Sequence, residues 1–429
     1  MRGAWRTTWL LLAFMVVNFA DKTVLGLAGP EIRADFGITR QEFGTAQSAF
    51  FALFSIAALG VSALTKRVGT TPLLLALALL WSAAQLPMVW GAAGFGLLVA
   101  TRVLLGAAEG PAAPVAMHHV HGWFPQRERA LPTAVLLVGA AAGVAVASPV
   151  LSWVITHWGW RWSFGVVGLM GIAWAAAWRV WGTEGPLAPP VGKEPAHSPQ
   201  DTLVVPLRRI LLSPTFLTAA FGSFAAYWSM STLLTWAPDY LESVIGWDLH
   251  QASTMVGVGA LANGVILLVH GLLSRRSALR VTPPRIPVGA GAGILVAIAG
   301  CATAVYGTTD SLVVKVPMMM GPMALAMVML TVASTACARI APPSQRGVVL
   351  GVLTSVYALG GILSPLVLGG MVDSAATVTA GYEHGWLLTS GLLVTGGVLA
   401  ALFCRPERTA RRLGVPEAPS GAAPVPVAH

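Results

Sequence analysis

The chain has 429 residues, of which 55% are hydrophobic and only 10% are charged, and its mean hydropathy is +0.73. This composition excludes a soluble globular protein of this length, because it leaves too little polar surface to face water. The net charge of +9 does not indicate a nucleic-acid-binding protein, because the basic residues are spread along the chain and not gathered in one module.

The predicted elements are membrane-spanning helices, which makes this an all-α membrane protein. Runs of about 20 mostly apolar residues, the length that crosses a hydrocarbon core of about 30 Å, recur along the whole chain. Twelve such runs lie near 7–28, 43–64, 72–92, 95–118, 131–154, 162–182, 214–237, 251–273, 286–307, 313–337, 347–371 and 385–404.

The spans fall into two predicted six-helix halves, 1–182 and 214–404. A Pro- and Gly-rich segment, 183–213, reads as a flexible cytoplasmic loop between them, and 405–429 reads as a disordered cytoplasmic tail. The turns "ALTKRVG" and "LLSRRSA", after the second and eighth spans, match each other and indicate a duplicated unit. Duplicated transporters bind their substrate near the membrane midplane, between the two halves.

The basic residues predict the orientation of the chain. If the N-terminus is cytoplasmic, most of the 26 Lys and Arg residues lie on the cytoplasmic side, and the outer loops hold only Arg33, Arg40 and Arg161. This asymmetry follows the positive-inside rule. We therefore predict a multi-pass protein of the cell membrane with both termini in the cytoplasm.

The first span carries Asp21 next to Lys22, deep in the apolar run. Charges at such depth are costly and usually functional. Neighbouring residues on a helix do not face each other, so each of the two needs a partner on another helix, a water molecule or a substrate. Asp21 and Lys22 are therefore not predicted to neutralise each other.

The fourth span carries the other two deep charges, Arg102 and Glu109. Seven residues separate them, so they lie on one face of the helix with a rise of about 10 Å between them. Small residues around Glu109 leave room for a close helix, water or a ligand. The alternative, that these charges form structural ion pairs such as one between Asp21 and Arg102, stays open at this point.

Other polar and metal-like features are weaker. Cys301, Cys337 and Cys404 have no metal-ligand spacing and predict no disulfide framework. The run "HHVH" (118–121) favours a surface cluster, and "MMMGPM" (318–323) favours apolar packing, with Gly321 and Pro322 softening that helix. No metal, cofactor or enzymatic site is predicted, and no phosphate-binding G-x-x-x-x-G-K-[ST] loop occurs.

The second half offers polar and aromatic candidates for ligand contact. Tyr227 and Trp228 lie in the seventh span, and Thr354 and Tyr357 lie in the eleventh. These side chains could hydrogen-bond to a ligand or stack on it, although packing is the simpler reading for any single one.

Several motifs together resemble a known family. The twelve spans, the central loop and the repeated turns resemble the major facilitator superfamily. Within it, the chain resembles the anion:cation symporter family of organic anion:proton symporters, through "NFADKTVLGLAGPEI" (18–32), "TRVLLGAAEGPAAP" (101–114), "WFPQRERA" (123–130), "HWGWRWSF" (157–164) and "TWAPDYL" (235–241).

The resemblance implies roles for the membrane charges. Asp21 and Glu109 would be the protonation sites, Lys22 would hold the carboxylate of the substrate, and Arg102 would tune Glu109 and belong to the substrate site. The turns after the second and eighth spans would gate the transporter through Lys66, Arg67, Gly69, Arg275 and Arg276.

The chain also departs from the family pattern. Phe19 and Lys22 stand where members usually have Tyr and Arg, and a point charge then replaces a bidentate guanidinium. Lys66 replaces an acidic residue of the gating turn, and Thr70 and Thr71 replace a basic pair. Thr354 and Ala358 stand where span eleven commonly has two Asn. The family resemblance therefore does not predict the solute.

These observations predict a secondary active transporter that imports a small organic anion, such as a sugar acid or an aromatic acid, by proton symport with alternating access. Its partners would be that anion, protons and the bilayer, and it would work as a monomer. The alternative is a proton-coupled exporter or drug antiporter of the same superfamily, which Lys22 disfavours because a fixed cation suits anions. A membrane sensor that transports nothing is the third possibility.

Overall fold

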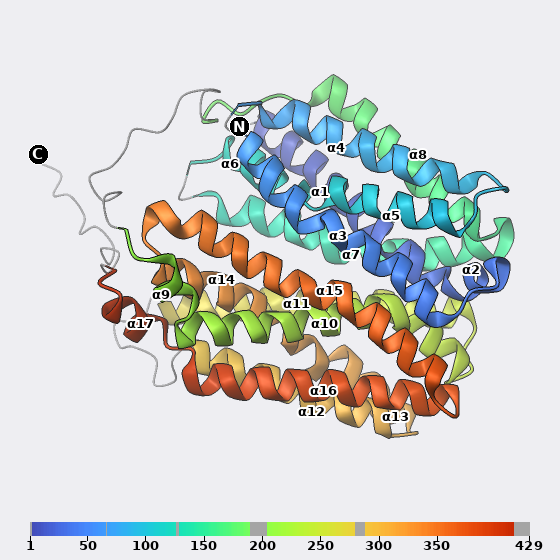
Figure 1. Cartoon of the computed structure of the whole chain (residues 1–429). Coiled ribbons are helices and arrows are strands. Elements are labelled where there is room, and N and C mark those ends of the chain that lie inside the picture. The colour runs from blue at the N-terminus through green and yellow to red at the C-terminus, as the bar shows by residue number, and fades with distance from the viewer. Residues whose placement is uncertain (1, 66, 126–127, 189–203, 279–287, 416–429) are drawn as a thin grey trace, which may run out of the picture.

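The computed structural model describes residues 2–65, 67–125, 128–188, 204–278 and 288–415, and within these ranges every regular element is a helix. The long helices run roughly alongside one another in two groups (Figure 1). This arrangement confirms the predicted all-α membrane fold with two halves.

The first half begins at the N-terminus and ends before the central loop. Its elements are α1 (Arg2–Leu27), α2 (Gly29–Phe36), α3 (Arg40–Leu64), α4 (Thr70–Gln85), the 3₁₀ helix η1 (Leu86–Val89), α5 (Phe95–Glu109), α6 (Ala112–His121), α7 (Ala130–Trp158) and α8 (Trp160–Trp181).

The second half follows the central loop. Its elements are α9 (Leu207–Leu211), α10 (Pro214–Ser243), α11 (Leu249–Ala278), α12 (Val288–Thr308), α13 (Leu312–Met320), the 3₁₀ helix η4 (Pro322–Met327), α14 (Val328–Ile340), the 3₁₀ helix η5 (Pro343–Gln345), α15 (Arg346–Ser374), α16 (Val378–Phe403) and α17 (Pro406–Arg412).

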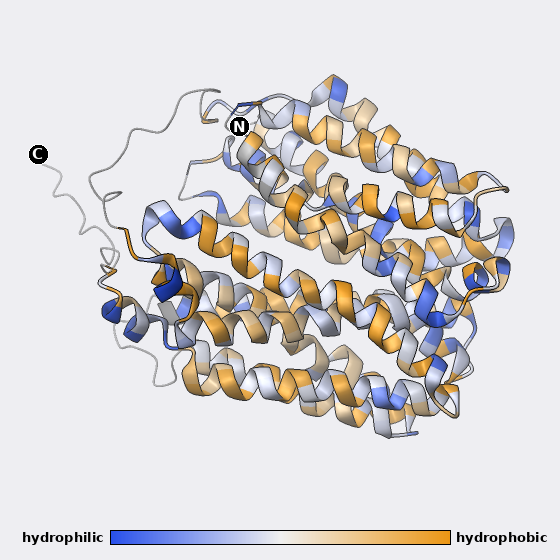
Figure 2. Cartoon of the chain, in the orientation of Figure 1, coloured by the Kyte–Doolittle hydropathy of each residue, from blue (hydrophilic) through white to orange (hydrophobic). Residues whose placement is uncertain are grey.

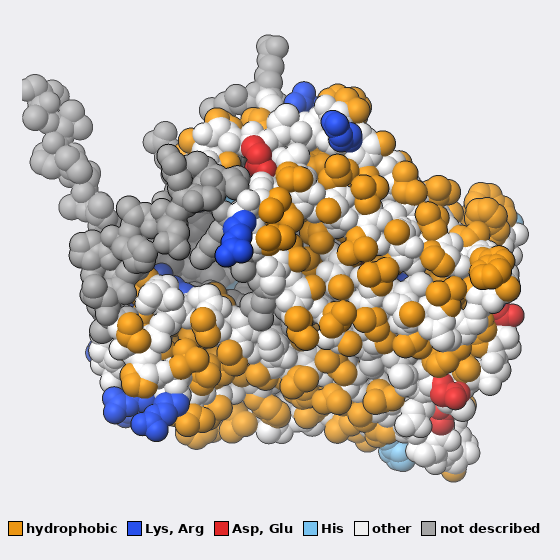
Figure 3. Space-filling model, turned by 45° about the horizontal axis from the view of Figure 1, so that its top comes forward, with side chains coloured by type: hydrophobic (Ala, Val, Ile, Leu, Met, Phe, Trp, Pro, Cys, Tyr) orange, Lys and Arg blue, Asp and Glu red, His pale blue; other side chains and the backbone are white. Residues whose placement is uncertain are grey.

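The helices of the described residues are consistent with the twelve spans that the sequence predicts. Ten helical segments are long and apolar enough to cross a membrane, by length and composition. α3 and α10, with 25 and 30 residues, stand at the other two predicted spans and pack inside the same bundle. Apolar residues dominate the middle of the helices (Figure 2), and apolar side chains are spread over the face of the described residues that Figure 3 shows.

Two spans are broken where the sequence places a proline. The span predicted as one helix over 95–118 divides into α5 and α6, because Pro111 has no N–H to continue the ladder. Glu109 is consequently the last residue of α5, at the break. The softening predicted at Gly321 and Pro322 is confirmed, since α13 ends there and η4 begins.

The two halves meet mainly along two helix pairs, in which α3 packs on α15 and α7 packs on α11, and α1 also packs on α10. Glycines allow this close approach. A Cβ on Gly44 of α3 would lie 2.3 Å from the carbonyl oxygen of Pro365 on α15, and a Cβ on Gly361 would lie 3.0 Å from the ring of Phe51.

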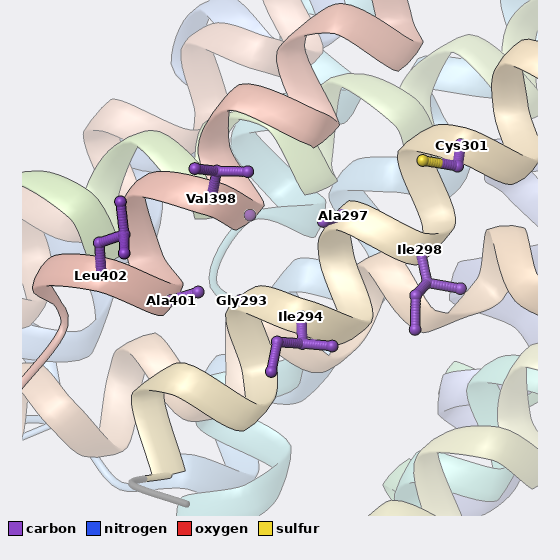
Figure 4. Close-up of a pocket in the computed structure, with 9 residues that line it drawn as sticks. Gly293, Ile294, Ala297, Ile298, Cys301, Val398, Ala401 and Leu402 are labelled. Atoms are coloured by element: carbon purple, nitrogen blue, oxygen red, sulfur yellow. The ribbon is translucent and has the colours of Figure 1, made fainter.

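Within the second half, α12 packs tightly on α16 through small residues. A Cβ on Gly293 would lie 2.3 Å from the backbone nitrogen of Ala401. The two helices leave a shallow groove lined by Ile294, Ile298, Cys301, Val398 and Leu402 (Figure 4). The groove offers no charge to an anion, and its exposed aliphatic side chains suit contact with lipid tails.

The central loop and the C-terminal tail contain more structure than the sequence predicts. The 405–429 tail, predicted as disordered, contains α17, whose Thr409 and Ala410 are buried. The Thr409 and Thr215 hydroxyls are 2.7 Å apart, which ties α17 to the start of α10. The predicted flexible loop contains α9, while residues 189–203 and 416–429 lie outside the described ranges.

Candidate functional site

The four predicted membrane charges gather in one buried cluster inside the first half. Asp21 and Lys22 come from α1, and Arg102 and Glu109 come from α5. Asp21 has 0% of its surface exposed, and Arg102 and Glu109 have 2% each. The Lys22 side chain is 11% exposed, which makes it the most accessible of the four.

Lys22 and Glu109 form an ion pair that joins α1 to the end of α5. The Lys22 Nζ lies 2.8 Å from the Glu109 Oε2. The same ammonium donates a hydrogen bond of 2.6 Å to the Asn18 Oδ1, one turn earlier on α1. It also lies 4.3 Å from the centre of the Phe19 ring, close enough for a cation–π contact.

Asp21 and Arg102 are linked through an amide that the sequence reasoning did not single out. Gln85, the last residue of α4, donates from Nε2 to the Asp21 Oδ1 at 2.8 Å. Its Oε1 accepts from the Arg102 Nη2 at 2.6 Å. The contact between this acid and this base is therefore made through Gln85, in place of a direct salt bridge.

These contacts agree with the prediction that Asp21 and Lys22 do not neutralise each other, because each reaches a different neighbouring helix. The cluster contains two acids and two bases, so it is balanced when all four are charged. Asp21 Oδ2 and Arg102 Nε make no hydrogen bond to other described residues. A further anion in this buried place would upset the balance unless a proton arrived with it.

The candidate contacts of the second half divide into two kinds. Tyr227 on α10 faces the first half, with its ring 5.7 Å from that of Phe51, and it lies 5.0 Å from the ring of Tyr357 on α15. Thr354 lies one turn before Tyr357 and is half-buried. Trp228 faces the interior of its own half, where its indole N–H donates to the Thr389 hydroxyl at 3.1 Å.

The candidate gating turns lie at the end of the bundle that carries the N-terminus. Arg67 and Arg276 are exposed, and Gly69 directly precedes α4. Lys66 and the side chain of Arg275 lie outside the described residues.

The first of these turns binds a carboxylate that the sequence analysis missed. Glu184, just after α8, accepts hydrogen bonds from the Thr71 backbone N–H at 2.7 Å and the Thr70 hydroxyl at 2.8 Å. It therefore caps the N-terminus of α4, where backbone N–H groups have no partner within the helix. A Cβ on Gly69 would lie 2.8 Å from its Oε1. The signal in the sequence was a lone acid after the sixth span.

We expect Glu184→Gln to lower the stability of the detergent-solubilised protein by about 1 kcal/mol, as for the loss of a helix cap. Burial opposes the charge of Glu184, but the hydrogen bonds from Thr71 and Thr70 hold its pKa below the ordinary 4.5. The stabilisation is therefore full above pH 4.5 and is lost as the pH falls through the depressed pKa. Thermal unfolding at pH 7 and pH 4 measures this. The control is Glu407→Gln, which changes an exposed carboxylate on α17 and should leave the unfolding temperature unchanged at both pH values. If wild type and Glu184→Gln unfold at the same temperature at pH 7, Glu184 does not act as a helix cap.

At the opposite end of the bundle, a second cluster joins the two halves. Asp239 of α10 accepts from Arg33 Nη2 at 2.5 Å and from Arg40 Nε at 2.8 Å, and both arginines belong to the first half. The Tyr382 hydroxyl of α16 donates to the same carboxylate. The Asp373 carboxylate of α15 accepts from the backbone N–H groups of Arg40 and Gln41, at 3.3 and 2.7 Å, and so caps α3 across the interface.

Sequence reasoning missed this inter-half cluster. Arg33 and Arg40 were noted only as outer-loop charges, and Asp239 was noted only as part of "TWAPDYL". The available signal was that two basic residues flank a short outer loop, while the second half places an acid at the end of its first span.

Comparison with known proteins places the chain among membrane transporters. The sequence profile of the Major Facilitator Superfamily matches residues 10–365. The chain is 26% identical to a probable sulfoacetate transporter, SauU, of Cupriavidus necator, over 95% of this chain and 96% of that protein. It is 28% identical to the D-galactonate transporter of Escherichia coli, over 86% and 89%, and 26% identical to the hexuronate transporter of Bacillus subtilis, over 91% and 92%.

Solved structures share the fold. A bacterial homolog of the human lysosomal transporter Spinster, in an inward-facing and occupied conformation, superposes with a TM-score of 0.75 at 20% identity, covering 95% of this chain and 97% of that one. A D-xylose-proton symporter gives 0.72 at 12% identity, covering 94% and 98%. The profile match and the organic anions named for the relatives confirm the resemblance drawn from the motifs, and this chain belongs to the major facilitator superfamily, as a membrane transporter and not an enzyme.

Proposed function

We propose that the protein is a secondary active transporter of the cell membrane that imports a small organic anion together with protons. The observation that carries this proposal is the Lys22–Glu109 ion pair of 2.8 Å. In it, the cation suited to bind the substrate is held by a carboxylate suited to bind a proton. The organic anions named for the relatives support the substrate class.

The ion pair supplies a physical reason for coupling. A substrate carboxylate and the Glu109 carboxylate compete for the same ammonium of Lys22. A proton on Glu109 removes the competitor and leaves the cluster with one net positive charge, which the anion then balances. Proton binding therefore favours anion binding, and by linkage anion binding favours proton binding to the same extent. Asp21, held by Gln85, is a second place where a proton can be stored.

Alternating access requires the inter-half cluster to open and close. We propose that the two halves, 1–182 and 214–404, rock about the central site, and that both termini and the loop 183–213 face the cytoplasm. The Arg33 and Arg40 contacts to Asp239 would then close the outer side and break when the site faces outward. The protein would carry out this cycle as a monomer.

Uptake into proteoliposomes tests the proposal. We would offer radiolabelled sugar acids, aromatic carboxylates and dicarboxylates, with and without an inward proton gradient, to the wild type and to Lys22→Gln. Accumulation of an anion only with the gradient, and its loss in the variant, supports symport. The result that favours the exporter is different: no anion accumulates, and preloaded cationic or neutral compounds leave the proteoliposomes faster than they leave protein-free liposomes. The exporter hypothesis would then replace symport, and the role of Lys22 would be structural.

We expect Asp239→Asn to weaken the closed outer side by about 1.5–3 kcal/mol, since hydrogen bonds to charged groups contribute about this much. Hydrogen exchange of the amides in 40–48 and 366–374 should become at least about tenfold faster. Asp35→Asn is the matched control, because Asp35 pairs with Arg161 at 2.5 Å within the first half alone. Equal exchange in wild type and Asp239→Asn would show that this cluster does not hold the halves together.

A further inference from the structure

Two phenylalanines, Phe19 and Phe50, lie next to the candidate anion-binding ammonium, and Phe51 and Phe54 pack on Phe50. We call these four residues the phenylalanine cluster. The Lys22 Nζ lies 4.3 Å from the centre of the Phe19 ring and 6.0 Å from that of Phe50. The Phe50 ring lies 4.9 Å from Phe51 and 5.5 Å from Phe54. The face that α3 turns toward Lys22 is therefore aromatic.

The geometry limits where the body of a bound anion can go. A carboxylate oxygen binds an ammonium at about 2.8 Å, so the carbon atoms that follow the carboxylate lie about as far from Nζ as the Phe19 and Phe50 rings do. Asn18 and Glu109 already contact the same ammonium. The body of the anion would consequently pack against rings.

The cluster continues to the second half, where the site would be completed. Phe51 lies 5.7 Å from Tyr227, which lies 5.0 Å from Tyr357. A Cβ on Gly361 of α15 would meet the Phe51 ring at 3.0 Å. The aromatic contacts therefore continue from the phenylalanine cluster into the second half, and the two phenols can hydrogen-bond to one or two polar groups of a ligand.

Amide side chains, which can hydrogen-bond to several hydroxyl groups of a ligand, are scarce in this chain. The whole chain has only two asparagines, Asn18 and Asn263. The Asn18 Oδ1 is already bonded to Lys22, and its Nδ2 is the one amide donor left for a ligand oxygen among these groups. Gln85 is held between Asp21 and Arg102. A polyhydroxylated acid would therefore leave most of its hydroxyl groups without partners, and buried polar groups without partners weaken binding strongly.

We propose that the transported anion is a monocarboxylate on a small apolar body, best a single aromatic ring, and that Phe19 determines this selectivity. This inference rests on the proposed function, because it takes Lys22 as the binding cation. Packing of the ligand ring against the phenylalanine rings favours binding of an aromatic acid. The scarcity of amide partners disfavours binding of sugar acids. The selectivity then differs from that of the galactonate and hexuronate transporters among the relatives.

Calorimetric titration of the full-length protein in detergent tests the inference with benzoate and gluconate as probes. We expect the wild type to bind benzoate at least about tenfold more tightly than gluconate. Phe19→Leu, which removes the ring and keeps an apolar side chain, should weaken benzoate about fivefold or more and leave gluconate unchanged. Phe19→Tyr, which keeps the ring, should retain the preference and serves as the matched control. Lys22→Gln should abolish saturable binding of both.

The outcomes separate the two proposals. If gluconate binds more tightly than benzoate and both are lost in Lys22→Gln, the anion site stands and the apolar selectivity is wrong. If benzoate binds as predicted but Phe19→Leu binds it equally well, the assignment of selectivity to Phe19 is wrong. If binding of either anion is unaffected by Lys22→Gln, the proposed function itself fails and the inference falls with it.

Discussion

Glu109→Gln is expected to abolish accumulation of the anion driven by a proton gradient, while anion exchange across the same membrane continues in part. The amide keeps the size of the side chain and can still hydrogen-bond, but it cannot take up a proton at any physiological pH. Lys22 then has no carboxylate competing for it, so the anion binds without requiring a proton. Gradient-driven uptake should fall to the level of protein-free liposomes, and counterflow should remain measurable.

The measurement pairs two assays on one preparation. Uptake with an inward proton gradient reports coupling, and counterflow into preloaded liposomes reports binding and the movement of the halves. Glu407→Gln should behave as the wild type in both, because Glu407 is exposed on α17, outside the bundle. Retention of gradient-driven accumulation in Glu109→Gln would remove Glu109 from the coupling mechanism and leave Asp21 as the remaining acid of the cluster.

The second large effect concerns Lys22. We expect Lys22→Gln to abolish transport and to destabilise the protein by about 3–5 kcal/mol, because removal of one partner leaves the buried Glu109 carboxylate without its cation. The double variant Lys22→Gln with Glu109→Gln should recover most of the stability, since neither charge then remains, and should still fail to transport. Thermal unfolding and gradient-driven uptake of the three proteins measure both effects.

This double variant separates a structural from a functional role. Recovery of stability without recovery of transport assigns the pair to the transport cycle as well as to the fold. Recovery of both would mean that the ion pair only holds α1 on α5. Arg411→Gln, an exposed charge on α17, is the control for loss of a positive charge.

Much of the fold was accessible from hydropathy alone. A run of about 20 apolar residues must form a helix in a bilayer, because no water satisfies its backbone groups there. The spans and the two halves could therefore be predicted, and so could the four intramembrane charges that make up the candidate site. Pro111 itself indicates a break in the helix, but the hydropathy pattern continues through it, and the span is therefore predicted as one helix.

The partners of these charges were not accessible. Whether Arg102 reaches Asp21 directly or through Gln85 depends on how α4 and α5 are rotated against α1, and Gln85 is 64 positions from Asp21 in the sequence. Glu184 and Thr70 are separated by 114 positions, and Arg33 and Asp239 by 206. Helical periodicity describes one element at a time and carries no information on such pairs.

The sequence by itself determined what kind of protein this is: an all-helical membrane transporter with two acids and two bases buried in its first half. Only the tertiary structure decided that Lys22 pairs with Glu109, that Gln85 joins Asp21 to Arg102, and that Asp239 ties the halves together at one end. The physical reason is that burial in a bilayer is a property of each segment. The choice of a charge partner is instead settled by the packing of several helices, where each buried charge takes the counter-charge or hydrogen-bonding group that the neighbouring helix brings within reach.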